Sequence, residues 1–120
     1  MKYSSSFTHD LDFGTVGEDW VNDIFTSGKK VEVKTDRLAH KTGNVFIEYE
    51  SRGKPSGVST SDAHYWIYII DESKSAIILD VTILKDKLRK FHKEGRYLMN
   101  GGDNDTSKGF LIPIHELFKQ

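Results

Sequence analysis

Tyr65-Trp66-Ile67-Tyr68-Ile69-Ile70 is a run of six apolar and aromatic residues in this 120-residue chain. Successive side chains of a strand point to opposite faces, so a strand made only of such residues is buried on both faces. The run therefore predicts a central strand of a sheet. The turn at Asp71 to Lys74 leads into a second apolar stretch, Ala76 to Leu79, which we expect to be a further strand.

Two more strands are expected before this central strand. The stretch Val31-Glu32-Val33-Lys34-Thr35-Asp36, within a strand from Lys30 to Asp36, alternates apolar and polar residues. Its valines and its charged side chains therefore lie on opposite faces. Asn44 to Glu50 also alternates, with Val45, Ile47 and Tyr49 on one face and Phe46, Glu48 and Glu50 on the other. The turn signal Thr42-Gly43-Asn44 separates the two strands.

Three segments carry helix signals. Val16, Trp20 and Ile24 recur every four residues, Thr15-Val16-Gly17-Glu18 fits a capping box, and residues 1–12 are expected to form a flexible lead-in. A short helix is expected from about Ser59 to His64, because Ser59 or Ser61 can cap it. Ile83, Leu84, Lys87, Leu88 and Phe91 trace a further helical stripe, which Gly95 ends.

The tail of the chain completes the predicted fold. Gly101 to Asp105 is expected to be a mobile loop, and Phe110 to Ile114 an edge strand because Pro113 cannot donate a ladder hydrogen bond. Glu116 to Lys119 add a last helical turn. The element order predicts one domain, residues 1–120, of the mixed α/β class, with a mixed sheet flanked by helices.

Composition restricts the function classes. The chain is 37% hydrophobic and 29% charged, as in ordinary soluble domains, and no apolar run is long enough to span a bilayer. Its N-terminus lacks the apolar core of a signal peptide, so the expected location is cytoplasmic. It has no cysteine, and its formal charge of −1 argues against a protein that coats nucleic acid non-specifically.

Glu32 and Lys34 are the first candidates for catalysis. A carboxylate and an ammonium group two residues apart on one strand face suit a metal-dependent nuclease, in which the acid holds Mg²⁺ and the lysine holds a phosphate oxygen or the attacking water. The alternative is an incidental pair on a solvated strand face. If the two strands pair as an antiparallel hairpin, Glu32 can lie near Glu48. Glu48 could equally form a structural ion pair with Lys34.

Other polar residues are weaker candidates. Glu18 could be presented to a metal by its helix, or it could simply complete the capping box. Asp23 lies either late in the helix or on a very short strand. The loop from Arg52 to Ser61 offers cations, hydroxyl groups and a following helix N-terminus that together attract phosphate, although a solvated turn would look the same. The five histidines show no spacing typical of a metal site.

Three stretches together resemble a known family. These are Val31-Glu32-Val33-Lys34-Thr35-Asp36, Thr42-Gly43-Asn44-Val45-Phe46-Ile47-Glu48 and Arg52-Gly53-Lys54-Pro55-Ser56-Gly57. They resemble small proteins, many of them phage-encoded, of the PD-(D/E)XK nuclease-like superfamily, which includes restriction enzymes and Holliday-junction resolvases. The resemblance covers about residues 13–70. It implies a restriction-endonuclease-like core and phosphodiester hydrolysis on DNA with Mg²⁺ or Mn²⁺.

The resemblance implies site residues in two alternative registers. In one, Glu32 and Lys34 form the motif's Glu-x-Lys and Asp23 is the preceding acid. In the other, Glu32 takes the place of the aspartate, Glu48 is the second acid, and Lys34 serves from the neighbouring strand, because Glu50 stands where a lysine is expected. Glu18 corresponds to the helix glutamate of resolvase-like members. No proline-aspartate pair is present.

The implied mechanism uses a metal held by Glu32 and Glu48 with help from Glu18, while Lys34 orients water or neutralises charge. Arg52, Lys54 and Ser56 would bind the DNA backbone. The leading hypothesis is a Mg²⁺-dependent DNA endo- or exonuclease, with junction resolution and a homodimer both compatible with it. A catalytically inactive module that binds DNA or a protein partner is the main alternative, and a structural or accessory viral protein is a third.

Overall fold

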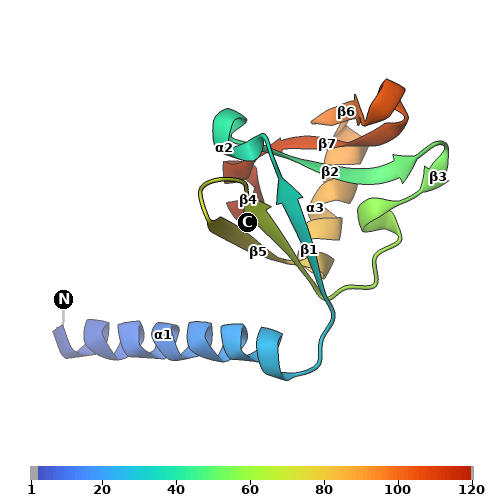
Figure 1. Ribbon diagram of the computed structural model, residues 1–120. Coiled ribbons are helices and arrows are strands. Elements are labelled where there is room, and N and C mark those ends of the chain that lie inside the picture. The colour runs from blue at the N-terminus through green and yellow to red at the C-terminus, as the bar shows by residue number, and fades with distance from the viewer. Residues whose placement is uncertain (1–2, 120) are drawn as a thin grey trace.

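The computed structural model describes residues 3–119, and it describes side chains for residues 14–102 and 104–119. Its helices and strands form a mixed α/β arrangement with two sheets, so the predicted class is confirmed (Figure 1). The helices are α1 (Tyr3–Thr26), α2 (Ala39–Thr42) and α3 (Val81–Glu94), with 3-10 helices η1 (Gly57–Ser59), η2 (Asp103–Asp105) and η3 (Ile114–Phe118). The strands are β1 (Val31–Asp36), β2 (Asn44–Ser51), β3 (Lys54–Pro55), β4 (Tyr65–Ile70), β5 (Ser75–Asp80), β6 (Leu98–Gly101) and β7 (Ser107–Pro113).

The first sheet has the strand order β1-β4-β5. β4 pairs in parallel with β1 and antiparallel with β5, so the predicted central strand is confirmed. Both of its neighbours are also at the expected places in the sequence. The antiparallel hairpin of β1 with β2, which would bring Glu32 near Glu48, does not form. The two strands belong to different sheets, which replace the single sheet expected from the sequence.

The second sheet is antiparallel, with the order β3-β2-β7-β6. The prediction that the C-terminal strand lies at an edge is wrong, because β7 pairs with β2 on one side and β6 on the other. Pro113 is compatible with this position because it is the last residue of β7. β6 was not expected from the sequence. Its sequence, Leu98-Met99-Asn100-Gly101, does not alternate apolar and polar residues, so it carries no strand signal. The side chains of Leu98 and Met99 are both exposed.

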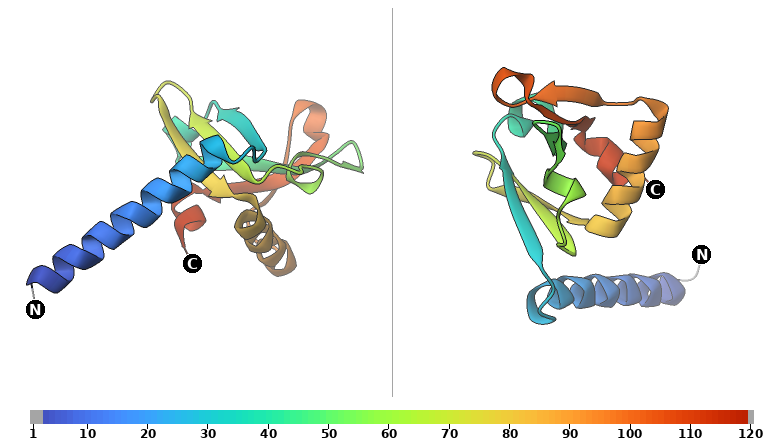
Figure 2. Two further views of the ribbon diagram at one scale, coloured as in Figure 1. Left: turned by 90° about the horizontal axis from the view of Figure 1, so that it is seen from below. Right: turned by 90° about the vertical axis from the view of Figure 1, so that its right-hand side faces the viewer.

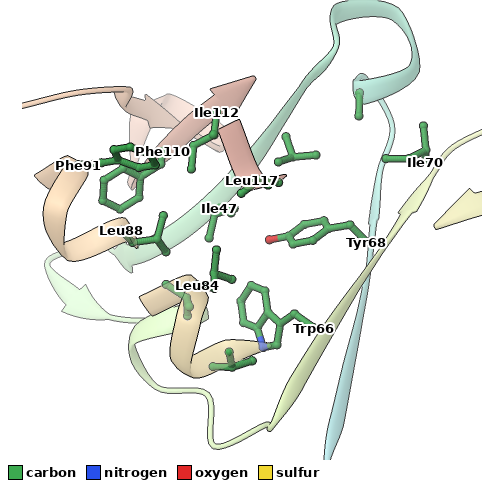
Figure 3. Close-up of a cluster of buried hydrophobic side chains, with 14 residues drawn as sticks. Ile47, Trp66, Tyr68, Ile70, Leu84, Leu88, Phe91, Phe110, Ile112 and Leu117 are labelled. Atoms are coloured by element: carbon green, nitrogen blue, oxygen red, sulfur yellow. The ribbon is translucent and has the colours of Figure 1, made fainter. Parts of the chain in front are cut away.

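The hydrophobic core lies between the two sheets and α3 (Figure 3). Val45, Ile47 and Ile112 of the second sheet are 0% exposed, and Trp66 of the first sheet is 2% exposed. From α3, Leu84, Leu88 and Phe91 complete the same cluster. The predicted helical stripe is therefore confirmed. Asp80 caps the N-terminus of α3 by accepting a hydrogen bond from the Ile83 amide, and Gly95 ends the helix in the left-handed conformation.

Helix α1 differs most from the sequence prediction. The expected lead-in is helical from Tyr3 onward, while Met1 and Lys2 lie outside the described residues. Thr15 and Glu18 consequently lie inside the helix, so they do not form the predicted capping box. Among the side chains of α1 that the structure describes, Ile24 is buried and Trp20 contacts Tyr65 edge-to-face at 5.8 Å between ring centres. The N-terminal part of α1 extends away from the rest of the chain (Figures 1 and 2).

This projection makes the molecule elongated. Its principal extents are 58 × 33 × 32 Å, and its radius of gyration of 16.9 Å exceeds the roughly 14 Å typical of a compact chain of this length. α1 leaves the apolar side chains of Val16, Trp20 and Phe25 exposed. No helix among residues 3–119 combines the length and apolar character needed to cross a membrane.

Two shorter segments also differ from expectation. The helix expected from about Ser59 to His64 does not form. A single 3-10 turn, η1, ends at Ser59, and the residues between η1 and β4 are not helical. The loop expected at Gly101 to Asp105 instead contains the end of β6 and η2. The final helical turn predicted at Glu116 to Lys119 corresponds to η3, which begins two residues earlier.

Candidate functional site

A pocket of about 240 Å³ opens between β1 and β2. Its position follows from the parallel pairing of β1 with β4, which sets Glu32, Lys34 and Asp36 beside residues of β4 whose side chains face the core. Val33, on the opposite face of β1, is 53% exposed. The charged face of this strand is therefore the one turned toward the second sheet. The residues that line the pocket are Lys34, Thr35, Asp36, Phe46, Glu48, Gly57, Trp66 and Tyr68.

Lys34 supplies the cation of this pocket. Its Nζ lies 5.9 Å from the centre of the Trp66 ring, close enough for a cation–π contact. The structural alternative for Glu48, an ion pair with Lys34, is not present: no such pair within 4.0 Å joins these two described residues. Lys34 is an exposed residue, so an anionic ligand can reach it.

Glu48 supplies an acid from β2, where its side chain is half-buried. The Ser56 hydroxyl donates a hydrogen bond to Glu48 Oε2 at 2.9 Å, which fixes one carboxylate oxygen. For Glu48 Oε1, no hydrogen bond to another described residue is present. β2 is irregular between Glu48 and Glu50, and Gly57 packs directly behind the Glu48 backbone.

Asp36 is a second acid of the pocket, and the sequence analysis did not select it. Its carboxylate accepts hydrogen bonds from the backbone amides of Leu38, Ala39 and Phe46 at 2.9–3.0 Å. These bonds turn the chain at the end of β1 and attach β1 to the first residues of β2. Asp36 is the last residue of β1 and lies two residues before Leu38, the N-cap of α2. An aspartate that ends a strand just before a turn is a signal for side-chain hydrogen bonds to the following backbone amides, and it could have indicated this role.

Tyr68 lines the pocket, and its buried side chain belongs to the core cluster drawn in Figure 3. Burial raises the pKa of this phenol far above its usual value, and the nearby carboxylates of Asp36 and Glu32 raise the same pKa further. The hydroxyl group therefore remains protonated at neutral pH. It can donate a hydrogen bond to an anionic ligand in the pocket.

The metal site predicted from Glu18, Glu32 and Glu48 does not form. Glu18 is exposed on α1, whereas Glu32 lies on β1 outside the pocket lining. Across residues 14–102 and 104–119, no three acidic or histidine side chains are grouped so as to hold a metal ion. Asp23 is not on a short strand; it lies in α1 and accepts a hydrogen bond from Lys29 Nζ at 2.6 Å.

The predicted DNA-binding residues follow β2 in sequence: Arg52 lies in the turn, Lys54 begins β3, and Ser56 directly follows β3. Arg52 and Gly53 both have positive φ, 51° and 77°, and form the tight connection between β2 and β3. Arg52 and Lys54 are exposed at this turn, outside the pocket lining. Ser56 is the one member of the set that contacts a candidate catalytic residue, through its hydrogen bond to Glu48.

The structure thus brings Lys34 and Glu48 together through two facing sheets, with Asp36 as an unexpected third member. Comparisons with protein-family models, with curated proteins and with solved structures gave no match.

Proposed function

We propose that the chain hydrolyses phosphodiester bonds of DNA with Mg²⁺ or Mn²⁺, at the pocket formed by Lys34, Asp36 and Glu48. The observation that carries the proposal is that two carboxylates and an ammonium group from different sheets line one pocket. Protein sites for Mg²⁺ commonly supply one or two carboxylates, and water and substrate phosphate complete the coordination. The resemblance to PD-(D/E)XK nucleases supports the same activity.

The donor atoms fit such an ion. Glu48 Oε2 accepts from Ser56, which leaves Oε1 available for a metal. The Asp36 carboxylate accepts three backbone hydrogen bonds, so about one of its roughly four lone-pair sites remains. Asp36 and Glu48 would hold the ion, which would supply a Lewis acid next to the scissile phosphate.

The remaining residues of the pocket would stabilise the reacting phosphate. Lys34 would neutralise negative charge that increases in the transition state, and the cation–π contact with Trp66 would orient its ammonium group. Tyr68 would donate a hydrogen bond from its protonated hydroxyl group. Arg52 and Lys54, exposed at the β2–β3 turn, would bind flanking phosphates.

A cleavage assay with matched variants tests this proposal. Glu48→Gln and Lys34→Met are expected to reduce Mg²⁺-dependent cleavage of linear and branched DNA by roughly 100-fold or more, because each removes a charge acting on the reacting phosphate. Glu50→Gln is the control: Glu50 lies two residues away on β2 and pairs with Lys108 at 3.5 Å. Wild-type turnover by folded Glu48→Gln would refute the proposal.

The second candidate is a module that binds DNA without cutting it. The lack of a third clustered acid or histidine among residues 14–102 and 104–119 favours this candidate. It predicts salt-dependent DNA binding without metal-dependent cleavage by wild type. Either activity would be exercised on DNA in the cytoplasm, which is the location we propose.

We further propose that the protein acts as a homodimer in which α1 packs on a second copy. Val16 and Phe25 of α1 are 66% and 69% exposed, and packing against a second copy would remove their apolar surface from water. Residues 3–26 carry five acidic and no basic residues, whereas residues 27–120 carry 16 basic and 13 acidic residues. The acidic, apolar helix is therefore complementary in charge to the body of another copy.

Sedimentation velocity tests the homodimer. Wild type is expected to sediment as a dimer, and Phe25→Ser as a monomer because a helix contact is lost in both copies. Leu98→Ser, which alters a 44%-exposed side chain on β6, should remain dimeric. A monomeric wild type at high protein concentration would refute this part of the proposal.

A further inference from the structure

A second groove, of about 300 Å³, is lined by residues of β2, η1, α3 and β7. One wall is a face of α3 with Lys85, Arg89 and His92, which follow the i, i+4, i+7 spacing of a helix. The opposite wall is formed by Tyr49 of β2 and Ser59 of η1. Both walls belong to segments that also contribute to the hydrophobic core, so the groove lies on a rigid part of the fold.

The groove combines an aromatic surface with positive charge. Its Tyr49 ring contacts the His92 ring edge-to-face at 5.6 Å between ring centres and packs against the Phe110 ring at 5.2 Å. Among the residues whose side chains the structure describes, its charged lining residues are Lys85 and Arg89, and no acidic side chain lines it. A ligand with a flat aromatic body and an anionic group matches this lining.

Both cations retain hydrogen-bonding capacity for a ligand. Arg89 is largely exposed, and its Nη1 donates to Asp86 Oδ1 at 2.7 Å; other donors of its planar guanidinium group remain free. Lys85 Nζ donates to the Ser61 carbonyl oxygen at 3.1 Å, which uses one of the three donors of an ammonium group. The contact with Ser61 also holds the lysine near the groove.

Neighbouring residues connect the groove to the first pocket. In β2, Glu48 lines the first pocket and the next residue, Tyr49, lines the groove. In η1, Gly57 lines the pocket and Ser59 lines the groove. The Ser59 hydroxyl also donates to the Tyr49 carbonyl oxygen at 2.7 Å, which ties η1 to β2.

We propose that this groove binds an unpaired nucleotide of the DNA strand, with its base against Tyr49 and His92 and its phosphate on Lys85 and Arg89. The assignment of the nucleotide to the strand cut in the first pocket rests on the proposed function. Binding of a nucleotide in the groove does not require cleavage. The ligand class is therefore single-stranded DNA, or the unpaired segment of a branched DNA.

Fluorescence anisotropy with labelled oligo-dT in EDTA tests the proposal, because no metal-dependent cleavage can occur. Arg89→Gln is expected to weaken binding by roughly tenfold and to lower the slope of log affinity against log salt by about 0.7, as for one lost phosphate contact on a single strand. Lys90→Gln is the control. Lys90 is the next residue of α3, is exposed and does not line the groove, so its neutralisation should leave the affinity at the wild-type value.

A second comparison tests the contact with the base. Tyr49→Leu should weaken binding of oligo-dT by about tenfold but leave binding of an abasic oligonucleotide of equal length unchanged. Circular dichroism establishes that this variant is folded, and Arg89→Gln gives an independent test because its side chain is exposed. Equal losses in Arg89→Gln and Lys90→Gln, or no loss in Arg89→Gln, would overturn the proposal.

The two proposals fail in distinguishable ways. Loss of cleavage in Glu48→Gln together with unchanged oligo-dT affinity in Arg89→Gln would support the nuclease and reject the nucleotide groove. Weaker binding in Arg89→Gln together with no cleavage by wild type would support the groove and reject the nuclease.

Discussion

Gly57 packs so closely against β2 that one added methyl group is expected to destabilise the fold. A Cβ atom at this position would lie 2.2 Å from the Glu48 carbonyl oxygen and 2.9 Å from the Glu48 carbonyl carbon. These are backbone atoms of a paired strand, so they cannot rotate away as the end of a side chain could. Gly57 also has a φ of +55°, which an L-residue adopts only at a cost.

The two effects give the expected magnitude for Gly57→Ala. The left-handed conformation costs an alanine about 1–2 kcal/mol, and forcing a methyl group into packed surroundings costs about 1–3 kcal/mol. Gly57→Ala should therefore lower the free energy of unfolding by about 2–5 kcal/mol. Movement of η1 away from β2 would also displace Ser56 from Glu48, so we expect weaker metal-dependent activity in the same variant.

Gly53→Ala is the matched control. Gly53 has a similar φ of +77°, but no atom of the described residues beyond its chain neighbours lies within 4 Å of a Cβ atom there, so only the conformational cost applies. Urea unfolding followed by tryptophan fluorescence should show Gly57→Ala to be less stable than Gly53→Ala by about 1–3 kcal/mol. If the two variants have equal free energies of unfolding, the close packing of η1 on β2 is refuted.

Three further changes are expected to have measurable effects. Asp36→Asn should lower the free energy of unfolding in urea by about 1–3 kcal/mol, because an amide cannot accept all three backbone hydrogen bonds of the carboxylate. The hydrogen bond from Lys119 lowers the pKa of Glu116, so stability from this pair is present above the ordinary glutamate pKa and lost as the pH falls through the lowered value. Urea unfolding at neutral and acidic pH should accordingly show a smaller loss of stability in Glu116→Gln than in wild type. Lys87→Met should reduce hydrogen-exchange protection in η3, since Lys87 Nζ donates to the carbonyl oxygens of Glu116 and Leu117.

The sequence predicted the elements whose apolar residues follow a regular period. β2 and α3 have such patterns, and Val45 and Ile47 of β2 are fully buried as expected; β4 was predicted instead from its continuous apolar run. These patterns can be detected in the sequence because each relates a residue only to neighbours two to four positions away. The same reasoning placed the N-terminus of α1 too late, because Thr15 and Glu18 match a capping box that the longer helix does not use.

Strand pairing could not be predicted, because it depends on contacts between distant parts of the chain. β1 and β2 follow each other in sequence, but α2 lies between them and Asp36 turns the chain there, so β1 pairs with β4 instead. The site shows the same limit. Lys34 and Glu48 line the same pocket, but Glu18 and Glu32 do not. The prediction that Glu18 and Glu32 join this site assumed a β1–β2 hairpin and a helix packed on the sheet. The catalytic roles of all four residues remain predictions.

The position of a bound metal ion tests the central claim most directly. Crystals soaked in MnCl₂ and measured at the manganese absorption edge would locate the ion by its anomalous scattering. We predict a peak between the carboxylates of Asp36 and Glu48, about 2 Å from an oxygen atom of Glu48, and no such peak in Glu48→Gln. A peak elsewhere, or none in the wild type, would contradict a metal-dependent nuclease at this pocket.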